Sequence, residues 1–522
     1  MSAEAAPAPG WSRPERGGAP QMNVRAAFFA LVAAFFLSTL TVATGLIVGV
    51  RGGDIACLLL AALLIMIALV PVSLDVGRAA ERRHIFLSMF SISYIVNFSI
   101  PVFTHYIPAV GPVDPAAMAY TNLMPEDVAR GQGLAIMGLL AFYVGYSIPV
   151  GALLRPALPT HFREWGHATA LFATTALILL GWLVFIARSV GAIPAALGSG
   201  WIGGFSGATL YGSALLTATY LKYRSRAALF LLATLVPLTS AVMFTTGSKT
   251  AVLMPFAMIV LTWIVVQRRI RLRWILAGIV AIALLYPVAQ FWRQDVLEQN
   301  TLTMVDVARN PGPALRKTAH FLSTAPPSEY LTVGFKAAGV RLDAIGVASV
   351  ILRDTPAVSP FQNGRTIMLV PIGFVPRILW PDKPQIHIGD WISETYTPYG
   401  YLSDSNLSVS WIGEFYLNFG LIAVALGMAV LGVMLRCVHL TLIRDALSIP
   451  LVAAGATVMR ELLLGVQGSL TSVINATVIA LIPLFLVHLL VRAAGGTYAV
   501  SAFPGAERAG GSAPQSPGSP SQ

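Results

Sequence analysis

Long apolar segments recur along most of the chain and constrain the fold more than any other feature. Each runs for about 18 to 25 residues, which matches the ~30 Å hydrocarbon core of a bilayer. The composition agrees, because 56% of the 522 residues are hydrophobic and only 11% are charged. So few charged side chains cannot cover the surface of a water-soluble protein. The sequence therefore predicts an all-α polytopic membrane protein.

We predict about twelve transmembrane helices, counted as apolar runs separated by polar connections. The first, Ala26–Val50, is too long for the apolar core of a signal peptide. The others are expected at 55–74, 85–103, 131–154, 168–187, 206–222, 227–246, 251–267, 274–292, 416–435, 446–465 and 471–491. The weakest are 206–222, which is short, and 446–465, which contains Arg460 and Glu461.

The net charge of +11 is concentrated in short connections between the apolar runs. The main basic clusters are Arg78/Arg82/Arg83, Lys222/Arg224/Arg226 and Arg268/Arg269/Arg271/Arg273. Membrane proteins retain Lys and Arg on the cytoplasmic side. This rule explains the charge without a nucleic-acid partner, and it places both termini in the cytoplasm.

The same rule divides the chain into segments. Residues 1–24 and 493–522 are rich in small residues and Pro, and are expected to be disordered cytoplasmic ends. Residues 25–292 would hold the helices before a large loop, and 416–492 the helices after it. The loop, residues 293–415, is expected to be partly helical and extracytoplasmic.

The cysteines predict neither a disulfide nor a metal site. Cys57 and Cys437 are expected near opposite membrane faces, and the eight histidines are scattered. The chain has no Cys/His spacing typical of a zinc site. We therefore expect no metal.

A polar, aromatic and Pro-rich stretch at 365–420 interrupts this apolar chain. Within it, VPRILWPDKP places Arg377 and Lys383 on either side of Trp380. A guanidinium group binds phosphate through two hydrogen bonds, and an indole face stacks on the apolar face of a sugar. Arg365 adds a further cation. The alternative for any one of these cations is a solvent-exposed or ion-paired role.

Acidic residues of the same stretch could activate a sugar hydroxyl as general base. Asp382 lies in the Trp-Pro-Asp-Lys-Pro segment, and Glu414 lies in WIGEFYLNFG at the start of an apolar run. An ionisable group at that position is costly, which makes Glu414 a functional candidate. The alternative is an interfacial acid that faces water. Arg460 and Glu461 would form either a buried pair or part of the site.

The segment Thr246–Thr250, Thr-Gly-Ser-Lys-Thr, resembles a phosphate loop but lacks the glycine before the lysine. One alternative is a helix end at Gly247 followed by a helix start capped by Ser248, with Lys249 extending to the interface. The other is an anion site formed by Ser248, Lys249 and the first N–H groups of the new helix. Both alternatives remain open.

From Gly339 to Gly420 the chain resembles the bacterial oligosaccharide repeat unit polymerases, the Wzy-type enzymes of O-antigen and exopolysaccharide assembly. The resemblance rests on a helix opened by Arg341 that runs to Arg353-Asp354-Thr355-Pro356, and on the motifs FVPRILWPDKP and IGEFYLNFG. The upstream TTGSKTAVLMP is similar to the family's Gly-Ser-(Arg/Lys) element.

The resemblance implies an inner-membrane glycosyltransferase with its site on the periplasmic face. Such enzymes transfer a growing glycan from undecaprenyl pyrophosphate to the next lipid-linked repeat unit. It implies no cofactor, nucleotide sugar or metal. The implied partners are the lipid-linked donor and acceptor and membrane lipid, with a chain-length regulator as a further candidate.

The resemblance also assigns expected roles to the candidate residues. Pyrophosphate would be held by Lys249, Arg341, Arg377 and Arg460, the base would be Glu414 or Asp382, and Trp380 would contact sugar. Ser248, Arg365 and Lys383 complete the expected substrate-binding set.

Two alternatives to a polymerase remain. An O-antigen ligase would use the same donor with a lipid A-core acceptor, although VPRILWPDKP favours the polymerase. A transporter or lipid-linked sugar flippase of about twelve spans is the other alternative. Against it stands the long loop at 293–415, which breaks the symmetry that such folds show between their halves.

Overall fold

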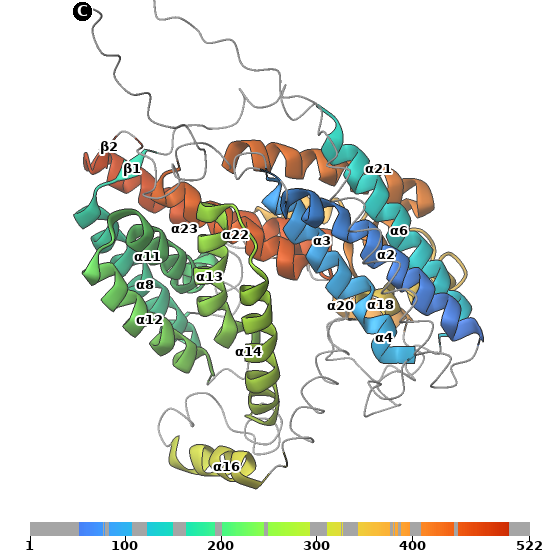
Figure 1. The fold of residues 1–522 in the computed structure, drawn as a ribbon, viewed down its shortest axis with the longest axis horizontal. Helices are drawn as coiled ribbons and strands as arrows, with labels where there is room; N and C mark the ends of the chain where they lie inside the picture. Colours follow the sequence, from blue (N-terminus) through green and yellow to red (C-terminus); the bar gives the residue numbers. More distant parts are fainter. Residues whose placement is uncertain are drawn as a thin grey trace, which may run out of the picture.

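The structure is a computed structural model of the full chain. It describes residues 52–76, 78, 83–106, 123–149, 163–193, 201–244, 249–292, 311–324, 326, 343–375, 379–380, 382–384, 388–396, 409–442, 447–498 and 500. Most of the described chain is helical (Figure 1). The only strands in these ranges are β1 (Glu164–Trp165) and β2 (Thr497–Tyr498), which pair antiparallel.

The helices before the predicted loop follow the apolar runs. They are α2 (Gly52–Val76), α3 (Ile85–Phe98), α4 (Ile100–Tyr106), α6 (Pro125–Ser147), α8 (His167–Ser189), α10 (Trp201–Ser206), α11 (Ala208–Tyr223), α12 (Arg226–Phe244), α13 (Lys249–Gln267) and α14 (Leu272–Phe291). The predicted span at 26–50 lies outside the described residues.

The later part of the chain alternates short and long helices. They are α16 (Pro311–Thr324), α18 (Ala344–Asp354), α19 (Leu369–Gly373), α20 (Gly389–Tyr396), α21 (Trp411–Leu442), α22 (Ile449–Gly465) and α23 (Leu470–Ala493). Within the expected loop, α18 ends at Asp354, immediately before the predicted stop at Thr355-Pro356.

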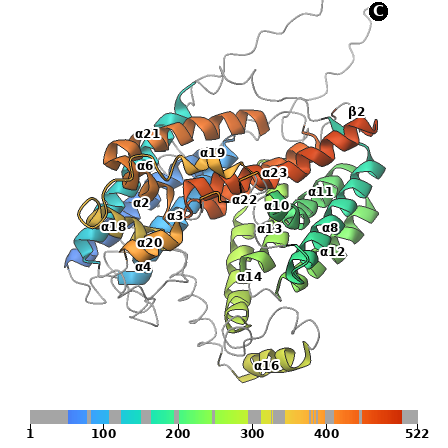
Figure 2. The same cartoon turned by 180° about the vertical axis from the view of Figure 1, so that it is seen from behind.

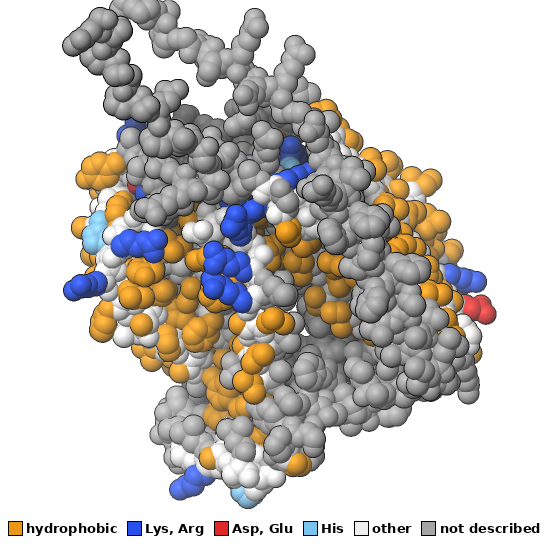
Figure 3. Space-filling view, viewed as in Figure 1, with side chains coloured by type: hydrophobic (Ala, Val, Ile, Leu, Met, Phe, Trp, Pro, Cys, Tyr) orange, Lys and Arg blue, Asp and Glu red, His pale blue; other side chains and the backbone are white. Residues whose placement is uncertain are grey.

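Eight of the described helical segments are long and apolar enough to cross a membrane. They are Gly52–Val76, Ile85–Phe103, Pro125–Ser147, His167–Ser189, Arg226–Phe244, Thr250–Gln267, Trp411–Leu442 and Leu470–Ala493. Hydrophobic side chains also cover much of the described surface on the face seen in Figure 3, where Lys and Arg gather in a few patches. The chain is an all-α polytopic membrane protein.

Two helix groups meet along α22 and α23. In Figure 1, α8, α11, α12 and α13 form one group, and α2, α3 and α6 form the other. Helix α22 contacts both α3 and α11, so it joins the groups. Figure 2 shows α23 crossing between them from behind. Aromatic side chains pack inside the second group. Phe90 stacks on Phe142 and on Trp411, with ring centroids 3.8 and 5.8 Å apart.

Helix α21 is broken near its start, which the predicted single span at 416–435 did not anticipate. Phe419 (φ −145°, ψ 19°) and Gly420 (φ 71°, ψ −154°) are not helical. The chain folds back there. The evidence is that the side chains of Ile412 and Met428 both lie against Gly138 of α6. In a straight helix these two residues would be about 24 Å apart. The positive φ at Gly420 requires glycine.

The break divides α21 into a short part, 411–418, and a long part, 421–442. The long part crosses α6 at glycine contacts. A Cβ at Gly145 would lie 1.9 Å from the Ala429 carbonyl oxygen, and one at Gly432 would lie 2.1 Å from the Phe142 oxygen. Backbones this close are typical of helix pairs in membranes that meet through small residues.

Two further predictions concern the cysteines and the Thr-Gly-Ser-Lys-Thr segment. Cys57 and Cys437 are both free thiols, as predicted. Helix α12 ends at Phe244 and α13 begins at Lys249, so a helix boundary falls at the Thr-Gly-Ser-Lys-Thr segment as expected. The cap residues Gly247 and Ser248 lie outside the described residues.

Candidate functional site

The short part of α21 places Glu414 against the first turn of α23. The carboxylate is fully buried, and its Oε2 accepts a hydrogen bond from the Leu470 N–H at 2.6 Å. Its Oε1 accepts one from the Thr471 hydroxyl at 3.2 Å. The first N–H groups of a helix have no partner within the helix and carry partial positive charge. A carboxylate at this position accepts hydrogen bonds from these N–H groups and is attracted by their partial positive charge.

The segment 361–375 is bonded to the break in α21. The Gln362 and Asn363 N–H groups donate to the carbonyl oxygens of Leu417 and Asn418, at 2.9 and 3.1 Å. Breaking the helix frees these carbonyls, and a buried free carbonyl within a membrane protein is costly. The segment therefore stabilises the break.

Thr366 connects the same segment to both helices. Its carbonyl oxygen accepts from the Thr471 hydroxyl at 2.9 Å, and its Oγ1 accepts from Asn418 Nδ2 at 2.7 Å. Asn418 Nδ2 also donates to the carbonyl oxygen of Glu414 at 2.7 Å. The short part of α21, the start of α23 and segment 361–375 thus form one hydrogen-bonded unit, which we call the bend unit.

Lys383 ties the Trp-Pro-Asp-Lys-Pro segment to the bend unit. Its buried Nζ donates to the carbonyl oxygens of Gly373 and Val375 at 3.0 and 2.9 Å. Gly373 lies directly against Asn475 of α23, whose Nδ2 donates to the Thr471 carbonyl at 2.9 Å. These two hydrogen bonds give Lys383 a structural role, and its role in substrate binding stays a prediction.

Three other predicted residues lie at the surface of this region. Arg365 is exposed and directly precedes Thr366. Trp380 is 40% exposed, and Asp382 is exposed. The structure thus brings Arg365, Trp380, Asp382, Lys383 and Glu414 to one unit, with only the last two buried.

Buried polar atoms without a hydrogen-bond partner occur around the bend unit. Within the part of the chain that the structure describes, they are Trp411 Nε1, Asn418 Oδ1, Gln467 Oε1 and Asn475 Oδ1. Gln467 belongs to this region because its carbonyl accepts from the Ser410 N–H at 2.7 Å. Buried polar atoms are normally paired with protein or water. This group therefore has hydrogen-bonding capacity that the described contacts leave unused.

Arg460 forms an ion pair with Glu461, with 2.9 Å between Nη2 and Oε1. A pair between these two residues was one of the two roles predicted from the sequence. Arg460 also interacts with Tyr211 of α11. In the described ranges no contact joins Arg460 to Glu414, and its Nε lacks a hydrogen-bond partner. Its role in pyrophosphate binding stays a prediction.

Several predicted site residues cannot be placed. Ser248, Arg341 and Arg377 lie outside the described residues, and the side chain of Lys249 does too. No group of three His, Cys, Asp or Glu side chains that could hold a metal ion occurs among the residues described.

The sequence reading missed the polar partners of Glu414. Asn418 follows Glu414 by four residues in IGEFYLNFG, which places both on one helix face. Asn475 is a lone amide within an apolar run, and that was the second available signal. Thr366 and Thr471 gave no signal, because single threonines are common in both loops and spans.

The carboxyl end of α18 holds a further ion pair that the sequence reading left unassigned. Arg353 donates from Nε and Nη2 to both carboxylate oxygens of Asp354, at 2.7 and 2.8 Å. These hydrogen bonds raise the pKa of Arg353. Nearby, the hydroxyl groups of Thr355 and Tyr396 lie 2.7 Å apart, which joins α18 to α20.

Comparison with known proteins decides the family. Residues 198–493 match the model of the family described as O-antigen polysaccharide polymerase Wzy, and this range is more than half of the chain. The protein belongs to the Wzy family. No curated protein matches the chain, and no solved structure does.

The match covers α10 to α23, and therefore the whole bend unit. The Wzy family assignment and the apolar helices identify a multi-pass inner-membrane protein that polymerises oligosaccharides. The resemblance found in the sequence is confirmed.

Proposed function

We propose that this Wzy-family protein is a glycosyltransferase that polymerises undecaprenyl-pyrophosphate-linked repeat units on the periplasmic face of the inner membrane. The observation that carries the proposal is the bend unit. It holds the exposed Arg365 and, through Lys383, adjoins the exposed Trp380 and Asp382. It also contains buried polar atoms that have no hydrogen-bond partner in the described parts of the chain. This combination suits a ligand with both anionic and hydroxyl-rich parts.

The proposed reaction is a displacement at the anomeric carbon of the donor. A hydroxyl oxygen of the acceptor bonds to that carbon, and the bond from the carbon to the pyrophosphate oxygen breaks. The electron pair leaves with undecaprenyl pyrophosphate, and the hydroxyl proton passes to a base. Asp382 is our candidate for this base, because it is exposed while Glu414 is buried and hydrogen-bonded. Glu414 then acts as a positioning residue.

Cations and an indole would complete the site. Arg365 and Arg377 would stabilise the negative charge that develops on the leaving pyrophosphate. Trp380 would stack on a sugar ring with the part of its surface that is exposed. Lys249 and Arg341 remain candidates for the pyrophosphate.

The periplasmic placement is supported by the two ends of the α3–α4 segment. Basic residues, including Arg78 and Arg83, gather beside His84 at its start. At its other end, His105 pairs with Asp343 at the start of α18, at 3.2 Å. The loop helix α18 therefore lies at the end away from the basic residues, as the charge rule requires of an outer loop.

Deletion of the gene tests the proposed function. We expect the deleted strain to carry single repeat units in place of long polysaccharide, and the plasmid-borne wild-type gene to restore the long chains. Full-length polymer that stays on its lipid carrier would instead indicate a ligase. Loss of lipid-linked units from the periplasm would indicate a flippase. Gel analysis of surface and lipid-linked polysaccharide distinguishes these outcomes.

A further inference from the structure

A second group of polar residues lies outside the bend unit, where the α2–α3 connection meets the ends of α13 and α21. We call it the arginine–histidine cluster. It consists of Asp75, Arg78, Arg83, His84, Tyr146, Arg268, Arg269, Arg436 and His439. None of these residues belongs to the proposed catalytic site.

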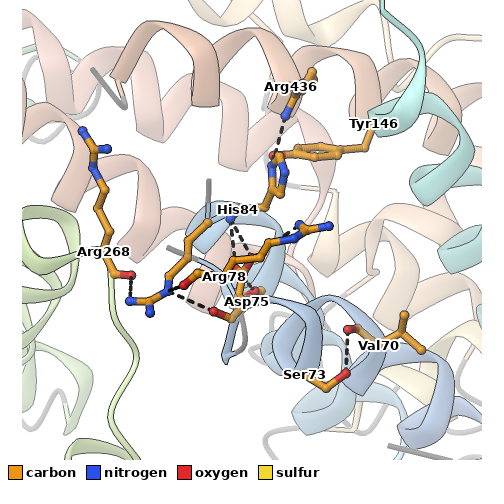
Figure 4. Close-up of polar contacts among 10 residues, drawn as sticks. Val70, Ser73, Asp75, Arg78, His84, Tyr146, Arg268 and Arg436 are labelled. Carbon is orange, nitrogen blue, oxygen red and sulfur yellow. Dashed lines mark hydrogen bonds and ion pairs between the residues drawn. The ribbon is translucent and has the colours of Figure 1, made fainter. Parts of the chain in front are cut away.

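Asp75 and Arg83 hold the cluster together. Both Asp75 carboxylate oxygens accept from the His84 N–H, at 2.9 and 3.0 Å, and Oδ2 accepts from Ser88 Oγ at 2.7 Å. Arg83 donates to the carbonyl oxygens of Asp75, Arg78 and Arg268 at 2.9 to 3.1 Å. These bonds cap the end of α2 and fix it to the end of α13. Figure 4 shows this arrangement around His84.

Two imidazole rings lie in the centre of the cluster. The rings of His84 and His439 are 5.0 Å apart, and His84 Nδ1 lies 3.0 Å from both Arg436 Nη1 and the Tyr146 hydroxyl. An arginine can only donate, so His84 Nδ1 carries no proton. Burial, with Arg436 and Arg78 nearby, lowers the pKa of His84 to about 3. His84 is therefore neutral and has an N–H at Nε2.

The described charges of the cluster are strongly unbalanced. Among the described residues, the guanidinium groups of Arg78, Arg83, Arg269 and Arg436 share the cluster with one carboxylate, that of Asp75. Guanidinium groups gathered in this way are suited to bind an anion.

His439 supplies an independent indication of a ligand. It is only 6% exposed, and its Nδ1 has no hydrogen-bond partner in the described parts of the chain. It lies within electrostatic reach of both Arg268 and Arg436. A metal ion could use two histidines, but the surrounding guanidinium groups would repel it. A neutral imidazole beside arginines can instead donate a hydrogen bond to an anion.

We propose that the arginine–histidine cluster binds a phosphate group, contributed by an anionic lipid headgroup or by free phosphate. Basic pockets between transmembrane helices are suited to lipid phosphates. Arg436 and His439 would contact the anion, and Arg269 would attract it from the surface, since its side chain is exposed. Arg83 would only position the surrounding backbone.

Thermal unfolding of the purified full-length protein tests the site. The probes are inorganic phosphate, and mixed micelles of detergent with either phosphatidylglycerol or phosphatidylcholine. We expect phosphatidylglycerol, inorganic phosphate or both to raise the unfolding midpoint in a saturable way, and phosphatidylcholine to have no effect. Stabilisation by phosphatidylglycerol alone identifies a lipid site, and stabilisation by inorganic phosphate identifies a site for the free anion.

Variants connect any stabilisation to the cluster. Arg436→Gln is expected to weaken the apparent affinity about tenfold, the effect of one charge-assisted hydrogen bond. Because Arg436 also contacts His84, the exposed Arg269→Gln is a second variant whose folding should be unaffected, and it should weaken binding several-fold. Arg226→Gln, at an exposed arginine that begins α12, is the matched control. Equal affinities in Arg269→Gln and Arg226→Gln proteins, or no anion effect on the wild type, would overturn the proposal.

Discussion

Glu414→Gln is expected to destabilise the protein by about 1 to 3 kcal/mol and to abolish most polymerisation. The neutral amide loses the attraction between the carboxylate and the first turn of α23. The carboxylate also accepts from Thr471, whose single hydroxyl proton is shared between Glu414 Oε1 and the Thr366 carbonyl. The bend unit would loosen, and the exposed residues that it supports would lose their positions. Thermal unfolding in detergent measures the first effect, and polysaccharide length in a complemented deletion strain measures the second.

Asp382→Asn is the matched comparison, because it removes a carboxylate from the same region at an exposed position. We expect it to abolish polymerisation while the unfolding midpoint stays at the wild-type value. This contrast separates a positioning carboxylate from a catalytic one. Wild-type chain lengths from a stably inserted Glu414→Gln protein would show that the bend unit does not support the site.

Gly145→Ala is expected to lower the free energy of unfolding by about 3 kcal/mol or more. The added Cβ would lie 1.9 Å from the Ala429 carbonyl oxygen and 2.6 Å from its carbon. Both atoms belong to the backbone of α21, so no side chain can move aside. The long part of α21 would have to separate from α6, which also carries the Gly138 contact with the short part.

Gly133→Ala provides the control on the same helix. A Cβ at Gly133 meets no heavy atom within 4 Å. Because alanine favours helix over glycine by about 1 kcal/mol, this variant should be as stable as the wild type or slightly more so. Yield and unfolding midpoint of the purified variants measure the difference. Equal midpoints for the two variants would contradict the close helix contact.

The transmembrane helices could be predicted because their signal is local. A run of apolar residues long enough to cross the bilayer marks a helix wherever it occurs. Predicted spans at 168–187 and 251–267 thus fall within two residues of α8 and α13. The Arg460–Glu461 pair was accessible for the same reason, since adjacent opposite charges within a span must be neutralised.

The bend in α21 was not accessible in this way. Apolar residues continue on both sides of Asn418-Phe419-Gly420, so hydropathy extends one span across the break. Gly420 is a signal for a break, but glycine is also frequent inside membrane helices. What decides the outcome is the pair of hydrogen bonds from Gln362 and Asn363, which no local pattern predicts.

Contacts distant in sequence also explain why candidate side chains could be selected without their roles. Glu414 was chosen because a carboxylate at the mouth of a span is unusual, and the structure shows a reason for it in the first turn of α23. Lys383 was chosen as a cation beside Trp380, and its Nζ is instead bonded to two carbonyl groups. In both cases the residue type indicated importance, and only the fold shows which group it contacts.

Reconstitution of the purified protein tests the central claim most directly. The protein is placed in lipid nanodiscs with undecaprenyl-pyrophosphate-linked repeat units as the only sugar source, and products are separated by length. We predict glycans of two, three and more repeat units, with one undecaprenyl pyrophosphate released for each bond formed. The Asp382→Asn protein should leave the single units unchanged. Folded wild-type protein that forms no product longer than one unit, or that requires a nucleotide sugar to do so, would contradict the account.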